Sequence, residues 1–205
     1  MLGKIKKEEK MKQDTFEYGV VYHVFSRGNN LENIFKEPRN YDLFLNLIKK
    51  YLLRVADVYA YCLLSNHFHL LVKIKEKTNI EDKSMQEKPY LGFSHFLNSY
   101  TQAINKAYNR KGSLFQKQLK RFRVTDANYF IQLVAYIHLN PIKHGFSDSL
   151  KYPYSSYNAM ISNKKTLLKR DEVLHYFDST ENFNYWHDFQ KIKHESILSL
   201  MNEDC

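Results

Sequence analysis

The chain has 205 residues, and its 31 Lys and Arg outnumber its 22 Asp and Glu to give a formal charge of +9. This length fits one domain of ordinary size with a small appendage. The hydrophobic content of 43%, with only 6 Gly and 4 Pro, excludes a disordered or collagen-like chain. A basic chain with 16 Tyr and 14 Phe favours nucleic acid as a partner, although a basic surface could equally meet an anionic membrane.

Cysteine usage and apolar run length indicate the compartment. The two cysteines are Cys62, within an apolar run, and Cys205, which argues against a disulfide framework or a Cys-rich zinc site. Residues 1–14 mix Lys with Glu and lack the apolar segment of a secretion signal. No apolar run reaches the roughly 18–20 residues that a membrane span needs. We therefore expect a cytoplasmic protein without a membrane partner.

The first half of the chain predicts three strands and one helix. The Val, Tyr and Phe residues of 17–26 predict a strand, and the following Arg-Gly-Asn-Asn is a turn signal. After Pro38, apolar residues at helical spacing predict a helix that continues to about residue 52. Two further strands are expected over 58–64 and 68–74, and the Ser-Asn between them suits a tight hairpin.

The second half predicts two helices and one strand. Residues 75–90 are polar and predict a flexible loop, and an apolar stripe predicts a helix over 91–109. A strand is expected over 118–124, followed by a helix that Thr125 or Asp126 caps.

This order of elements predicts an α+β sandwich, in which an antiparallel sheet has helices packed on one face. We divide the chain into a charged tail over 1–14, a domain over 15–160 and a small helical C-terminal extension over 161–205.

The positive charge is concentrated in one acid-free span. Between Glu87 and Asp126 there is no acidic residue, and the cations are Lys88, Lys106, Arg110, Lys111, Lys117, Lys120, Arg121 and Arg123. Cations neutralise phosphates, and the Tyr and Phe rings among them could stack on unpaired bases. Helical spacing instead predicts Phe93, Phe96 and Tyr100 as core residues.

The sharpest local pattern is Asn-His-Phe-His-Leu-Leu-Val at residues 66–72. Residues two apart on a strand share a face, so His67 and His69 would lie side by side, with Cβ atoms about 7 Å apart. Phe68 and Leu70 would face the other side. Two neutral imidazoles at this spacing can share a divalent metal with a further ligand from elsewhere. Two surface or hydrogen-bonded histidines are the alternative.

The helix after Asp126 has an apolar face and a polar stripe, which consists of Tyr129, Gln132, Tyr136, Asn140 and Lys143. Asn140 follows Tyr136 by one turn, so its amide lies beside the phenol. Pro141 disfavours helix at Asn140, and a kink or stop there would let Asn140 turn toward a metal. His138 falls on the wrong side of the helix for a third ligand. An amphipathic tyrosine at the core edge is the alternative for Tyr136.

Four local patterns occur together along residues 15–160. They are Ser-Arg-Gly-Asn-Asn (26–30), Leu-Leu-Ser-Asn-His-Phe-His-Leu-Leu-Val (63–72), Gly-Ser-Leu-Phe-Gln (112–116) followed by Arg121-Phe122, and Tyr-Ile-His-Leu-Asn-Pro-Ile-Lys-His-Gly (136–145) followed by Tyr-Pro-Tyr-Ser-Ser-Tyr (152–157). This combination resembles the single-tyrosine HUH transposases, and most of all the REP-associated tyrosine transposases. The long 75–90 segment and the residues after 160 depart from the simplest members.

The resemblance implies a ferredoxin-like HUH sandwich and a metal-dependent endonuclease and strand transferase that acts on single-stranded, hairpin-associated DNA. Tyr136 would be the nucleophile that forms a 5′-phosphotyrosine, and His67, His69 and Asn140 would hold Mg²⁺ or Mn²⁺. Gln132 and Lys143 are candidates for support of Tyr136. The expected DNA path comprises Arg27, Lys106, Arg110, Lys111, Lys117, Lys120, Arg121 and Arg123.

Two other functions stay open on the sequence. A non-catalytic hairpin-DNA-binding protein derived from a transposase would bind DNA without cutting it. A metal-dependent hydrolase would use water, with Tyr136 merely structural. Both a monomer and a homodimer are compatible with the resemblance.

Overall fold

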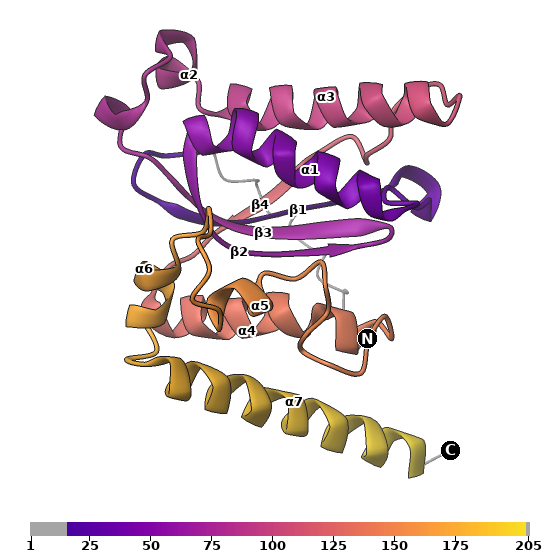
Figure 1. Cartoon of the computed structure of the whole chain (residues 1–205), viewed down its shortest axis with the longest axis vertical. Helices are drawn as coiled ribbons and strands as arrows, with labels where there is room; N and C mark the ends of the chain where they lie inside the picture. The colour runs from indigo at the N-terminus through magenta and orange to yellow at the C-terminus, as the bar shows by residue number, and fades with distance from the viewer. Residues whose placement is uncertain (1–15, 204–205) are drawn as a thin grey trace, which may run out of the picture.

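A four-stranded antiparallel sheet forms the centre of the structure, a computed structural model that describes residues 16–203 (Figure 1). Its strands lie in the order β2-β3-β1-β4. They are β1 (Val21–Arg27), β2 (Ala56–Leu64), β3 (His67–Ile74) and β4 (Lys120–Arg123). The predicted hairpin between β2 and β3 is confirmed. The predicted tail over 1–14 and Cys205 lie outside the described residues.

Helices cover both faces of this sheet. The helices α1 (Pro38–Tyr51) and α3 (Tyr90–Ala107) lie on one face, and α4 (Ala127–Lys143) and α5 (Tyr157–Met160) lie on the other (Figure 1). The α+β sandwich with an antiparallel sheet is therefore confirmed, but the prediction that helices pack on one face is wrong. The physical reason lies in β3, where seven of the eight residues are buried, so both of its faces need cover.

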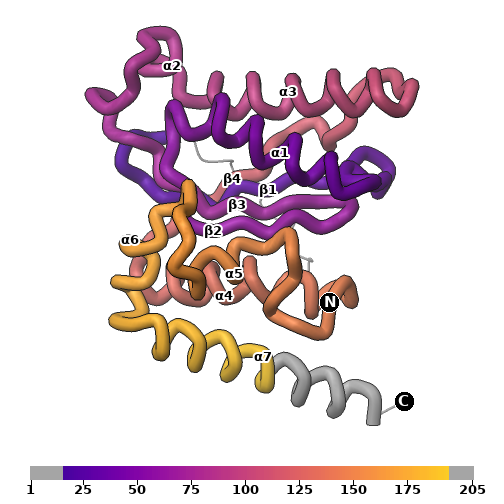
Figure 2. The backbone as a smooth tube through the Cα atoms, in the orientation of Figure 1, coloured from indigo at the N-terminus to yellow at the C-terminus, as the bar shows by residue number. Residues whose placement is uncertain are grey.

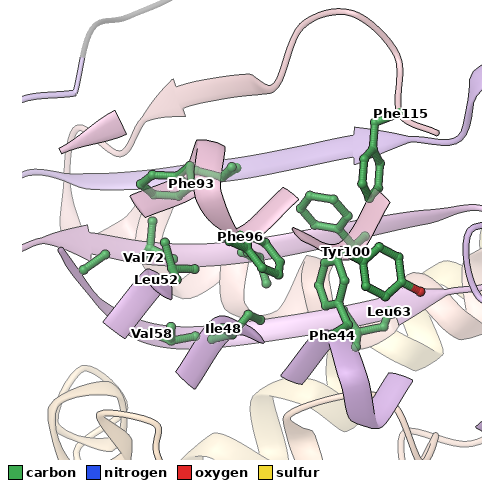
Figure 3. Close-up of a cluster of buried hydrophobic side chains, with 14 of the residues drawn as sticks. Phe44, Ile48, Leu52, Val58, Leu63, Val72, Phe93, Phe96, Tyr100 and Phe115 are labelled. Atoms are coloured by element: carbon green, nitrogen blue, oxygen red, sulfur yellow. The ribbon is translucent and has the colours of Figure 1, made fainter. Parts of the chain in front are cut away.

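The first core lies between the sheet and the pair α1 and α3 (Figure 3). Phe44 of α1 contacts Phe96 and Tyr100 of α3, with ring centroids 4.6 and 5.0 Å away. The Tyr100 hydroxyl donates a hydrogen bond of 2.7 Å to the Ile34 carbonyl, so its polar atom is satisfied inside the core. The prediction that the rings of α3 are core residues is confirmed.

The segment after β3 is more ordered than predicted. It contains the 3-10 turn η3 (Lys77–Asn79) and the short helix α2 (Lys83–Glu87). The Asp82 carboxylate accepts hydrogen bonds from the backbone N–H groups of Ser84 and Met85, which caps α2. Met85 is buried in the first core. The prediction of a flexible loop over 75–90 is therefore wrong, because one buried methionine and one cap hold the segment in place.

The second core lies under α4 on the opposite face. Asp126 caps α4 as predicted, since its carboxylate accepts from the Tyr129 N–H at 2.8 Å. Phe130, Val134 and Ile137 are buried there. Alternation along β2 places residues in both cores, and a register shift between Val58 and Ala60 reverses which residues face which core. The free thiol of Cys62 is buried beneath α4 as a result.

Residues after 160 add two helices, α6 (Arg170–His175) and α7 (Thr180–Glu203). Figure 2 shows α7 running along the outer side of α4. The predicted helical character of this segment is confirmed, whereas the division of the chain at residue 160 stays a prediction. Across residues 16–203, we find no helix with the length and apolar character that a membrane span requires.

A buried histidine pair joins α7 to α4. His187 Nδ1 donates to the Phe183 carbonyl at 2.7 Å, which leaves Nε2 to accept from His138 Nδ1 at 2.9 Å. His138 Nε2 in turn accepts from the Ser156 hydroxyl at 2.8 Å. His138 thus faces α7, as its position on the helix predicts. Burial lowers the pKa of His187 to about 4, so this network requires a neutral imidazole.

We expect acid to destabilise the protein in part through His187. Its folded pKa is below the unfolded value of 6.5, so its stabilisation is complete above pH 6.5 and is lost as pH falls toward 4. At pH 5 this histidine alone accounts for a loss of about 2 kcal/mol in the free energy of unfolding. Urea unfolding at pH 7.5 and pH 5 should show a smaller pH effect in His187→Gln. An equal pH effect in both proteins would contradict this role.

Candidate active site

The two histidines of the His-x-His pattern lie side by side, as predicted. His67 and His69 project from β3 toward α4, and their ring centroids are 5.3 Å apart. Each side chain is only 6% exposed. The residues between and after them, Phe68 and Leu70, point into the first core. The alternation of β3 therefore brings two imidazoles together beneath one helix.

Tyr136 of α4 stands over this pair. Its ring centroid is 5.8 Å from that of His69, with the two rings edge to face. The side chain is 37% exposed, so its hydroxyl-bearing ring meets both the histidines and solvent. Tyr136 also lines a pocket of about 310 Å³ with Arg27, His67 and His69. A tyrosine at this position can contact a ligand that the two histidines also contact.

Asn140 is completely buried beside these groups. Its amide Nδ2 donates to the Tyr136 carbonyl at 2.9 Å, one helical turn back. The predicted stop at this residue is wrong, since α4 continues through Pro141 to Lys143, whereas the alternative of a kink stays a prediction. The amide hydrogen bond orients Asn140 instead, and its Oδ1 has no hydrogen-bond partner among the described residues. Asn140 also raises the pKa of His67, in the opposite sense to burial, so the two side chains are neighbours.

Burial keeps the histidines of the site neutral. Desolvation, followed by the positive charges of His144 and Arg27, lowers the pKa of His67 to about 4. Burial also lowers the pKa of His69 well below its ordinary value, with smaller effects from His23 and His67. Neutral imidazoles have a free lone pair at pH 7, which a metal ligand requires.

Hydrogen bonds to the Nδ1 atoms of His67 and His69 determine which ring nitrogen of each histidine faces the site. His67 Nδ1 lies 2.6 Å from Asn66 Oδ1 and donates to it, because that oxygen can only accept. The opposite nitrogen, Nε2, is buried without a partner among the described residues. His69 Nδ1 lies 2.9 Å from His23 Nε2 on β1. Such partners orient imidazoles toward a metal and raise their basicity.

The unpaired atoms fit a divalent cation. Among residues 16–203 no group of three His, Cys, Asp or Glu side chains could hold a metal, so a third donor must be of another type. Asn140 Oδ1 and His67 Nε2 are both buried and unpaired, and unsatisfied buried polar atoms are rare outside functional sites. Imidazole nitrogens with an amide oxygen suit a cation such as Mn²⁺ or Mg²⁺.

The sequence patterns did not identify two residues near the site, His23 and His144. His23 reaches the site only because β1 pairs with β3, and a single histidine in a strand gives no signal of that pairing. His144 follows α4, and its ring centroid is 5.2 Å from that of His67. The sequence signal that could have identified His144 is its position in the Lys-His-Gly that ends the pattern over 136–145.

The proposed supporting residues both lie near Tyr136. Lys143 Nζ is 4.7 Å from the centroid of the Tyr136 ring, a cation–π contact. Burial lowers the pKa of Lys143. Gln132 lines the same cavity as Tyr136. The predicted polar stripe of α4 is therefore confirmed around its tyrosine, although Asn140 at its end is buried.

The eight basic candidates do not form one path. Arg27 and Lys120 line the pocket that contains His67, His69 and Tyr136. Lys117 and Arg121 line a groove against α3 on the other face of the sheet. Two of the remaining four pair with carboxylates: Arg110 donates to Glu32 at 2.9 Å, and Arg123 pairs with Glu17 at 3.1 Å. Lys106 and Lys111 are exposed near the end of α3. Alternation along β4 separates neighbours in sequence onto opposite faces.

The chain is similar to known proteins in sequence and in fold. A Haemophilus influenzae protein, provisionally named a REP-associated tyrosine transposase, is 28% identical over 107 residues, which are 50% of this chain and 59% of the relative. The structure of a REP-associated tyrosine transposase bound to a REP hairpin superimposes with a TM-score of 0.60. That match covers 76% of this chain and 87% of the other, at 16% identity. No family model matches the chain.

The resemblance to REP-associated tyrosine transposases is confirmed. The curated relative supports it in sequence, and the solved structure shows that the two proteins share a fold. The alignment spans less than two thirds of the Haemophilus protein's length. A bacterial tRNA(His) guanylyltransferase-like protein in complex with GTP superimposes at a TM-score of only 0.37, which is too low to indicate a common fold.

We expect the metal-free protein to hold His67 as the neutral Nδ1–H tautomer at pH 7, because Asn66 accepts that proton and burial disfavours a second one. Long-range ¹⁵N–¹H spectra of the imidazoles, recorded with a chelator between pH 7.5 and pH 5, would report this. In Asn66→Ala the same ring should populate both tautomers. A wild-type His67 that becomes doubly protonated near pH 6.5 would contradict the assignment.

Proposed function

We propose that this chain is a metal-dependent, single-strand DNA endonuclease and strand transferase that cuts hairpin-associated DNA through a 5′-phosphotyrosine at Tyr136. One observation carries the proposal: the partly exposed Tyr136 ring lies 5.8 Å from the ring of His69, and His67 Nε2 and Asn140 Oδ1 nearby are buried and unpaired. The similarity to REP-associated tyrosine transposases adds support, since a relative of the same fold was solved with a REP hairpin.

The chemical step exchanges one phosphodiester for another. The Tyr136 hydroxyl oxygen forms a bond to phosphorus while the bond from phosphorus to the 3′-oxygen breaks. The phenol proton leaves to solvent, and the departing 3′-oxygen takes up a proton to become a 3′-hydroxyl. Because the phosphotyrosine conserves the bond energy, a 3′-hydroxyl of another strand can attack it and restore the tyrosine. Strand transfer then needs no nucleotide cofactor.

His67, His69 and Asn140 would hold Mg²⁺ or Mn²⁺. When bound, the cation supplies positive charge at the scissile phosphate oxygens and stabilises the charge that develops on them. The residues of the chain supply the rest. Lys143 lies against the Tyr136 ring, where its ammonium group can bind a phosphate oxygen of the DNA. Gln132 lines the same cavity and can orient the hydroxyl.

The immediate surroundings of the site suit a nucleic-acid backbone. Arg27 and Lys120 line the pocket with Tyr136, and no acidic side chain is among its described lining residues. Gln116 and Gln118 add amide donors there. Such a set binds phosphate oxygens and positions a strand without reading its sequence. A DNA strand that follows these residues would bring a phosphate to the tyrosine.

Tyr136→Phe should abolish the covalent product. Wild-type protein, Mn²⁺ and an end-labelled hairpin with single-stranded flanks should give a protein-linked band on a denaturing gel. Tyr185→Phe is a control, because that exposed tyrosine of α7 lines neither the histidine pocket nor the larger cavity beside Tyr136. Cleavage that survives in Tyr136→Phe would indicate a water-using hydrolase. Hairpin binding without cleavage under any divalent metal would indicate a non-catalytic binding protein.

His23→Leu should weaken Mn²⁺ binding by about 10- to 100-fold, because His69 loses the partner that orients its imidazole. Calorimetric titration of Mn²⁺ into the protein measures this directly. His95→Leu serves as the control, since His95 is an exposed histidine of α3 on the opposite face of the sheet. Unchanged affinity in His23→Leu would remove His23 from the metal site.

A further inference from the structure

A cavity much larger than the catalytic pocket opens on the other side of Tyr136. Its volume is about 790 Å³. The sheet contributes Phe25 and Phe122, α4 contributes one wall that includes Tyr136, and α7 contributes Trp186 and Phe189. Figure 2 shows α7 lying along α4, and side chains of both helices line the cavity. The proposed endonuclease activity uses Tyr136, Gln132 and Lys143 on the α4 wall of this cavity but assigns no role to the aromatic residues of α7.

The chemistry of the cavity suits a flat and negatively charged ligand. Aromatic rings come from the sheet and from both helices. Lys143 and Lys193 are among its lining residues, and none of the described lining residues is acidic. The Trp186 indole N–H is buried without a hydrogen-bond partner among the described residues, so this tryptophan is incompletely satisfied by its own fold. Nucleobases offer a flat face and ring acceptors, and they carry a phosphate beside them.

Tyr136 connects the two spaces. It lines this cavity and also the pocket that contains His67 and His69. A nucleotide whose phosphate sits at the Tyr136 hydroxyl would therefore have its base within reach of the cavity. The volume lies within the range that proteins use for small organic ligands, about 300–1,000 Å³.

We propose that this cavity is a nucleobase subsite, in which Trp186 and Phe189 of α7 stack on an unpaired base next to the phosphate that Tyr136 attacks. The subsite rests on the proposed function, because its position beside the nucleophile identifies the strand it would hold. It assigns a role in substrate selection to α7, which contributes no proposed metal ligand or nucleophile.

Trp186 provides its own probe, since it is the single tryptophan of the chain. The test uses the full-length Tyr136→Phe variant, so that the DNA stays intact, and a labelled hairpin with either normal or abasic single-stranded flanks. Label anisotropy measures binding while tryptophan emission measures stacking. Normal flanks should quench Trp186 emission at saturation. Abasic flanks should bind more weakly and leave the emission unchanged.

Two substitutions on α7 complete the test. Trp186→Leu and Phe189→Leu should each weaken binding of normal flanks by about 5- to 150-fold, with no effect on abasic flanks. Tyr185→Ala should bind like the parent, because Tyr185 is an aromatic residue of the same helix that is 71% exposed and does not line the cavity. Phe189 is 47% exposed, so its variant is expected to keep the fold even if Trp186→Leu does not.

Binding without any change in Trp186 emission overturns the subsite, as does an equal loss of affinity for both kinds of flank. Failure to bind the hairpin at all overturns it too. The proposed function is scored separately on wild-type protein. Suppose that the covalent product forms but substitution of Trp186 or Phe189 does not change the preference for normal over abasic flanks. The endonuclease proposal is then supported and the subsite proposal is wrong. If bases quench Trp186 emission but no covalent product forms, the base-binding cavity is supported and the endonuclease proposal is wrong.

Discussion

The burial of β3 on both faces is the constraint on which the candidate site depends. Phe68, Leu70 and Val72 point into the first core, and His67, His69 and Leu71 point toward α4. A slip of one residue would place the histidines in the first core and Phe68 beneath Tyr136. The apolar packing against α1 and α3 therefore fixes the register of two polar side chains that it does not touch (Figure 3).

The same burial makes the site costly to maintain. A buried polar atom without a partner destabilises a fold by about 1–3 kcal/mol. His67 Nε2 and Asn140 Oδ1 are two such atoms, and they belong to neighbouring side chains. The two hydrophobic cores offset this cost. Asn66 and His23 then fix the ring orientations from behind, so little reorganisation is needed when a ligand arrives.

Local periodicity predicts most elements of this fold, because each signal lies within a short stretch of sequence. The alternation around His67 and the helical phase of Tyr136 both concern residues a few positions apart. The roles of His23 and Lys120 depend on which strands are neighbours, and the β2 register shift depends on packing against both cores. The prediction of a helix end at Asn140 failed for another reason. Pro141 disfavours helix at the residue before it, but tertiary packing maintains the helix there.

The proposed catalytic residues and the outer wall of the large cavity lie in different parts of the chain. His67, His69, Tyr136 and Asn140 all precede residue 144, whereas the outer wall of the large cavity comes from α7, after residue 179. Trp186 and Phe189 of that helix make none of the hydrogen bonds that orient His67 and His69. If the proposed function holds, substitutions on α7 would change which strand is bound and would leave the proposed metal ligands and nucleophile in place.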